Sequence, residues 1–169
     1  MNRVGALQAR VLRDGWLAFF VLLVVTQTAH VGEHAAQLVQ IHGLGREGPA
    51  ARGVVGQLDI EWVHFLWNIW ILGAVAALVR HYRQNRWLQG VLVIAAWHAF
   101  EHAGLLTTYL TTGVAGTPGL LARGGALAGG LPIARPDLHF LYNLLETLPL
   151  VAGALAEARS YGVRASRVS

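Results

Sequence analysis

The stretch from Gly15 to His42 reads GWLAFFVLLVVTQTAHVGEHAAQLVQIH, a long apolar run that carries a polar motif near its far end. At ~1.5 Å per residue, a helix of this length exceeds the ~30 Å hydrocarbon thickness of a bilayer. Its polar residues recur at helical spacing, and not in the alternation typical of a strand. The stretch therefore predicts a membrane-spanning helix with functional side chains.

Three further apolar segments follow, at residues 58–82, 87–112 and 136–158. Each is long enough to cross a membrane, and each is bounded by Gly, Pro or Arg. Charged residues make up only 13% of the chain, about half the share of a soluble domain. We therefore expect an all-α fold, an integral membrane four-helix bundle that occupies residues 1–169 as a single domain.

The arginines indicate how the bundle is oriented. Nine of them lie at the termini and between the second and third spans, namely Arg3, Arg10, Arg13, Arg80, Arg83, Arg86, Arg159, Arg164 and Arg167. The other two loops hold Arg46, Arg52, Arg123 and Arg135. By the positive-inside rule, we expect both termini on the cytoplasmic side of a bacterial cytoplasmic membrane. The basic residues form no dense tract, which argues against nucleic-acid binding.

Two motifs occur twice along the chain, in the same order. The pattern H-x-x-E-H stands at 30–34 and again at 98–102, whereas H-F-L-aromatic-N stands at 64–68 and at 139–143. Each half is a hairpin of two spans, so both halves have the same orientation. The repeat predicts two tandem helical hairpins, about 15–82 and 87–158, related by a pseudo-two-fold axis along the membrane normal.

The repeated polar residues lie inside apolar spans, all in the outer half of the predicted bilayer. A charge at bilayer depth costs at least ~2.5–3.5 kcal/mol, so these groups are expected to face one another. Glu33 and Glu101 would repel across the axis unless a cation lay between them. Cysteine is absent, which leaves imidazole and carboxylate as ligands.

We therefore expect a dinuclear metal site in which the two glutamates bridge the ions. Its predicted ligands are His30, Glu33, His34, His64, His98, Glu101, His102 and His139. The residues expected to orient them are Asn68, Asn143, Gln37, Glu61 and Glu146. His42 and His81 have no counterpart in the repeat and are interpreted as interfacial side chains.

Iron or copper is the expected metal, and zinc or manganese would also suit the ligands. Either preferred metal would fit an oxygen-dependent oxidoreductase that acts on a lipophilic substrate. The motif differs from the zinc-protease pattern H-E-x-x-H, so that activity is rejected. No catalytic residue is assigned.

Three alternatives stay open. The chain could bind heme b as an electron-transfer subunit of a larger membrane complex, with histidine pairs such as His30 and His98 as ligands. It could transport a metal or protons, although the apolar inner halves at 17–25 and 72–79 argue against a path through the bundle. The polar groups could also form a purely structural network, with about 0.6 kcal/mol per contact.

The duplicated H-x-x-E-H and H-F-x-x-N motifs resemble those of a family of small bacterial four-span membrane proteins. The resemblance covers most of the chain from His30 to Pro149. It implies a membrane location and no particular activity. Histidine-rich membrane desaturases and hydroxylases are a looser comparison, because this chain lacks their H-x-x-H-H boxes.

Overall fold

The computed structural model describes residues 3–46, 50–56 and 61–165, with side chains from residue 14 to residue 161. Its elements are α1 (Arg3–Leu38), the π-helical turn η1 (Val39–Gly43), α2 (Glu61–His81), α3 (Arg86–Thr112) and α4 (Arg135–Ala165). The predicted start of the second span at 58–60, and Arg167, lie outside the described residues. The expected all-α class is confirmed.

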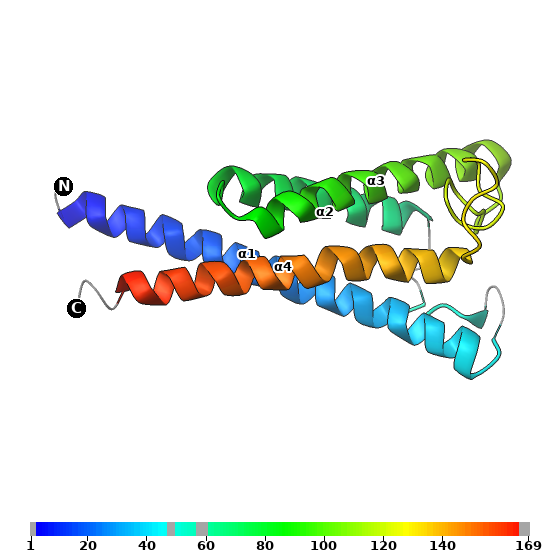
Figure 1. The fold of residues 1–169 in the computed structure, drawn as a ribbon, viewed down its shortest axis with the longest axis horizontal. Coiled ribbons are helices and arrows are strands. Elements are labelled where there is room, and N and C mark those ends of the chain that lie inside the picture. The colour runs from blue at the N-terminus through cyan, green and yellow to red at the C-terminus, as the bar shows by residue number, and fades with distance from the viewer. Residues whose placement is uncertain (1–2, 47–49, 57–60, 166–169) are drawn as a thin grey trace.

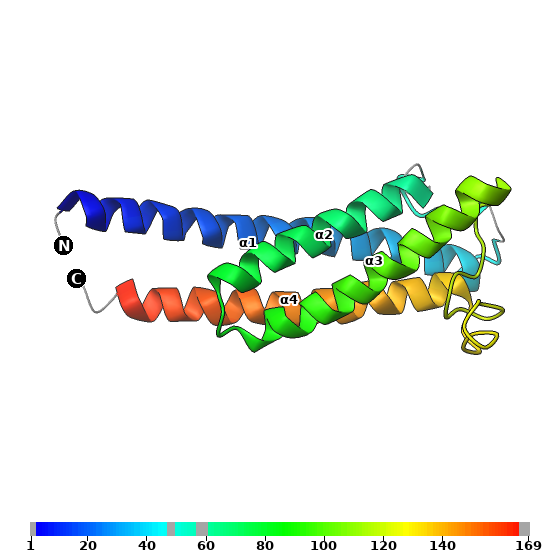
Figure 2. The same cartoon turned by 90° about the horizontal axis from the view of Figure 1, so that it is seen from above.

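The four helices run up and down in sequence order, so each is antiparallel to the next (Figure 1). α1 packs against α4, α2 against α3, and α3 against α4, while α1 and α2 touch over a smaller area. Among the described residues, the backbones of α1 and α3, and those of α2 and α4, do not approach each other closely; these diagonal pairs meet only through side chains, such as His64 and His139. The helices therefore form a four-membered ring around a common interior (Figure 2).

Four segments are long and apolar enough to cross a membrane: Asp14–Gly43, Glu61–His81, Arg86–Thr112 and Arg135–Tyr161. Both termini and the turn between α2 and α3 lie at one end of the bundle, and the two longer loops lie at the other (Figure 1). We call these the terminal end and the loop end. The arginine-rich segments of the sequence thus share the terminal end.

The turn at the terminal end is fixed by Asn85, which precedes α3. Its side-chain oxygen accepts a hydrogen bond from the backbone N–H of Leu88, and its amide donates to the carbonyl oxygen of Gly153 and to Glu157. A side chain of this kind satisfies backbone donors that the first turn of a helix leaves free. Asn85 therefore also ties the start of α3 to the end of α4.

The interior next to the terminal end is apolar. Its buried side chains come from all four helices and are Phe20, Leu23, Ile71, Ala74, Val75, Leu78, Leu88, Val91, Ala95 and Leu150. They occupy the early part of the two outgoing helices and the late part of the two returning ones. Toward the loop end this apolar layer gives way to buried polar residues, which form the candidate site.

Candidate metal centre

Six histidines meet inside the bundle, between the apolar layer and the loop end. They are His30 and His34 of α1, His64 of α2, His98 and His102 of α3, and His139 of α4. Each is at most 9% exposed. The motifs of both halves are thus brought together, as the sequence predicts for these six residues.

Three imidazole nitrogens from α3 and α4 form a nearly equilateral triangle. Nε2 of His102 lies 3.2 Å from Nε2 of His98 and 3.2 Å from Nδ1 of His139, and the third side of the triangle is 3.4 Å. The remaining ring nitrogens of His102 and His139 are buried and have no hydrogen-bond partner in the described part of the chain. Nitrogens at this spacing can share protons through hydrogen bonds, or they can coordinate one metal ion.

A second group combines His30, His34, His64 and His139, whose ligand atoms all lie within 4.8 Å of one another. The Nε2 atoms of His30 and His34 are 3.1 Å apart. Gln37, which the sequence predicts to orient a ligand, places its side-chain oxygen 3.3 Å from Nδ1 of His34. His139 belongs to both groups, so the two groups are adjoining parts of one centre.

The buried carboxylate of Glu146 contacts one member of the histidine triangle. Oε1 of Glu146 lies 3.0 Å from Nδ1 of His98. A carboxylate in this position accepts the Nδ1 proton, so it keeps a metal-binding imidazole in the tautomer whose Nε2 is free. Gln27 donates from its amide to Asn143 at 3.1 Å and to Glu146 at 3.2 Å. The indole N–H of Trp67 donates to the oxygen of Gln27 at 3.0 Å. This network holds the carboxylate in place.

The two repeated asparagines lie one turn beyond a centre histidine, as their spacing predicts. Each donates its side-chain amide to the backbone carbonyl of that histidine, Asn68 to His64 at 2.9 Å and Asn143 to His139 at 3.0 Å. They therefore bond to the backbone that carries the histidine and not to its ring. Only Asn143 is also joined to the network of Gln27.

The two repeated glutamates do not enter either histidine group, contrary to the bridging role expected from the sequence. Each accepts a backbone N–H from the loop that follows its helix. Val55 donates to Glu33 at 2.7 Å, and Leu120 donates to Glu101 at 2.6 Å. These hydrogen bonds hold the two carboxylates at the loops and apart from the histidine groups.

A glycine in each loop makes this approach possible. A Cβ at Gly53 would overlap the carboxylate of Glu33, and a Cβ at Gly119 would overlap that of Glu101. Both glycines also have positive φ, 77° and 70°, which side-chain-bearing residues rarely adopt. The same contact of glutamate and glycine therefore occurs in both halves of the chain.

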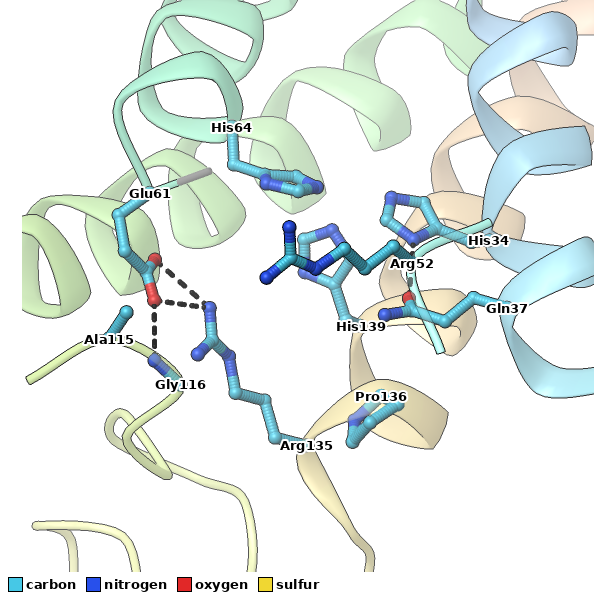
Figure 3. Close-up of a pocket in the computed structure, with 10 residues that line it drawn as sticks. All are labelled: His34, Gln37, Arg52, Glu61, His64, Ala115, Gly116, Arg135, Pro136 and His139. Carbon is cyan, nitrogen blue, oxygen red and sulfur yellow. Dashed lines mark hydrogen bonds and ion pairs between the residues drawn. The ribbon is translucent and has the colours of Figure 1, made fainter. Parts of the chain in front are cut away.

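A cavity lies between the histidines and the loops (Figure 3). On its outer side the Nη2 atom of Arg135 lies 2.8 and 2.9 Å from the two carboxylate oxygens of Glu61. The backbone N–H of Gly116 donates to the same carboxylate at 3.1 Å. Glu61, expected from its spacing to orient a histidine, is thus part of an ion pair at the cavity wall.

The two unmatched histidines lie at span ends, outside the centre. His42 in η1 places Nε2 2.7 Å from Oδ1 of Asp137, an exposed contact between the end of the first span and the start of the last. His81 stacks on the ring of Trp16 at the terminal end, with the ring centroids 4.7 Å apart. Neither residue belongs to the two histidine groups, and their interpretation as interfacial side chains stays a prediction.

Sequence reasoning missed three residues around the centre. Gln27 precedes His30 by three positions, so the helical spacing that identified the histidines would also have included it. Arg52 and Arg135 line the cavity, but they belong to loop-end segments whose path the repeat does not predict.

Comparisons with family models, curated proteins and solved structures found no match for this chain. The geometry of the site therefore carries the functional argument alone.

Proposed function

We propose that this chain is an integral membrane protein that binds two transition-metal ions in its six-histidine centre. The triangle of His98, His102 and His139 is the observation that carries the proposal, because its sides measure 3.2, 3.2 and 3.4 Å. An ion bound to imidazole nitrogens at about 2.0–2.1 Å in tetrahedral directions separates them by about 3.3–3.4 Å. The three side chains already have that spacing.

The second ion would be held by His30, His34 and His64, with His139 between the two ions. Support comes from the membership of His139 in both groups and from its buried, unpartnered Nε2. An imidazole that uses one nitrogen for each ion would satisfy that atom. The matched contacts of Glu33 and Glu101 with their loops support the proposed origin of the two halves as repeats with pseudo-two-fold symmetry.

Ligation by imidazole alone favours copper, iron or zinc over manganese, which prefers oxygen ligands. The ion in the triangle would have three imidazole nitrogens and a coordination position left for another ligand, whereas the second ion would have four. Oxygen-dependent oxidation of a lipophilic substrate is the reaction that we propose for an iron or copper centre. Such a protein would have its termini in the cytoplasm and its loop end on the opposite face of the membrane.

Three alternatives receive less support from the geometry. The rings of His34 on α1 and His139 on α4 have their centroids 4.3 Å apart, which leaves no room for a porphyrin between these two helices at that point. The apolar layer of ten buried side chains lies between the centre and the terminal end, which disfavours transport through the bundle. A structural network without metal could share protons among the three nitrogens, but it would leave the buried Nε2 of His139 without a partner among the described residues.

The test is elemental analysis and a visible spectrum of the full chain purified from membranes in mild detergent. We expect about two first-row metal ions per chain and no Soret band. A double variant, His98→Ala with His102→Ala, should lose one ion, whereas His81→Ala, at the terminal end, should retain both. A folded protein without metal would contradict the proposal, and a strong Soret band would favour heme.

A further inference from the structure

The cavity at the loop end is large enough for more than water. Its volume is about 410 Å³, within the range of about 300–1,000 Å³ that is usual for ligand pockets. The cavity is lined by His34, His64 and His139 of the centre together with Arg52, Arg135 and Glu61. A molecule in it could therefore contact both the histidine centre and a guanidinium group.

The two arginines differ in how their charge is compensated. Arg135 is paired with the buried carboxylate of Glu61, which Gly116 holds in place. Arg52 extends its side chain into the cavity (Figure 3). It makes no hydrogen bond or ion pair with any residue in the described ranges. Among the described residues, the guanidinium of Arg52 therefore has no partner that compensates its positive charge.

This charge lies beside a centre that contains no carboxylate among its six grouped ligands. Metal ions bound there would add further positive charge to the same space. Like charges separated by a weakly polar cavity repel, and the repulsion is strongest where water is scarce. A negatively charged ligand between Arg52 and the histidines would turn this repulsion into attraction.

We propose that the cavity binds an organic oxyanion, a carboxylate or a phosphate, through the guanidinium of Arg52. The planar fork of an arginine donates two parallel hydrogen bonds to either group. The rest of the molecule would lie against His34, His64 and His139. The inference rests on the proposed metal centre only for this second contact, whereas the contact with Arg52 requires no metal.

The experiment is calorimetric titration of the purified full chain in neutral detergent with three probes: inorganic phosphate, benzoate and short-chain phosphatidic acid. We expect at least one probe to bind, and Arg52→Gln to weaken its binding by about tenfold or more. Arg52→Lys should lie between the two, because it keeps the charge and loses the fork. Arg46→Gln is the matched control, a loop-end arginine outside the cavity lining.

The metal content of each sample separates the two proposals. Probe binding that depends on Arg52 in a metal-free protein would support the oxyanion site and contradict the metal centre. A metal-loaded protein that binds no probe, or binds equally well after Arg52→Gln, would overturn the oxyanion site. Binding of phosphatidic acid alone would identify a lipid headgroup as the source, and binding of phosphate or benzoate would identify a soluble ligand.

Discussion

Glu146 and His98 form a buried pair, with Oε1 of the carboxylate 3.0 Å from Nδ1 of the imidazole and both side chains at most 1% exposed. No counterpart of this pair exists in the first half. Counted from the matched histidines, the position of Glu146 is taken there by Ile71, which packs in the apolar layer. The two parts of the centre therefore differ in their supporting charge, although their histidine motifs are the same.

Because of this difference, we expect the two metal ions to bind with different affinities. Glu146→Gln keeps the size of the side chain and removes the carboxylate that supports His98. We expect the affinity for one ion to fall by about 10–100-fold, with little change at the other. Competition with a chromophoric chelator measures both affinities. Glu157→Gln, near the terminal end, is the control, and an equal loss at both ions after Glu146→Gln would contradict the assignment.

Substitutions of Glu33 and Glu101 can distinguish two roles for these residues: a hydrogen bond to the neighbouring loop, or a bridge between two metal ions. Glu33→Gln and Glu101→Gln retain an oxygen that accepts the loop amide, so we expect both variants to keep their metal content. Glu33→Ala and Glu101→Ala remove the acceptor and should destabilise the protein by about 1–3 kcal/mol, with faster proteolysis of the loops. Thermal unfolding in detergent and limited proteolysis are the measurements. Loss of an ion in either Gln variant would instead support the bridging role that the sequence predicts.

His139 is the residue whose loss should affect both ions. Its Nδ1 lies in the triangle, and the residue also belongs to the group of His30, His34 and His64. We expect His139→Ala to weaken both ions and His64→Ala to weaken one, as read from metal per chain after identical purification. Identical losses in these two variants would mean that His139 serves a single ion.

The orientation of the chain in the membrane is a separate prediction. Reporter fusions at the C terminus and near Gly119 should report opposite sides, because the end of α4 and the loop after α3 lie at opposite ends of the bundle (Figure 1). The C-terminal fusion should be active only as a cytoplasmic reporter. Activity of both fusions on the same side would exclude the four-span arrangement.

The sequence predicted the helices and the convergence of six histidines, since apolar length and a period of 3.6 determine a span and its buried face. It did not predict where Glu33 and Glu101 would point. A helical period places a residue on a face within a wide arc, and the neighbouring loop then determines the partner. The amides of Val55 and Leu120 belong to loops with no periodic pattern, so their hydrogen bonds to the two glutamates could be found only in the structure.

The apolar layer borders the centre on the side of the terminal end, and the cavity borders it on the side of the loop end. We therefore expect metal ions and any bound oxyanion to reach the centre by way of this cavity, past Arg52 and Arg135. An occupant of the cavity should then delay the loss of bound ions. A chelator should strip the ions more slowly when the cavity is filled, so occupancy would be recorded in the rate of metal release.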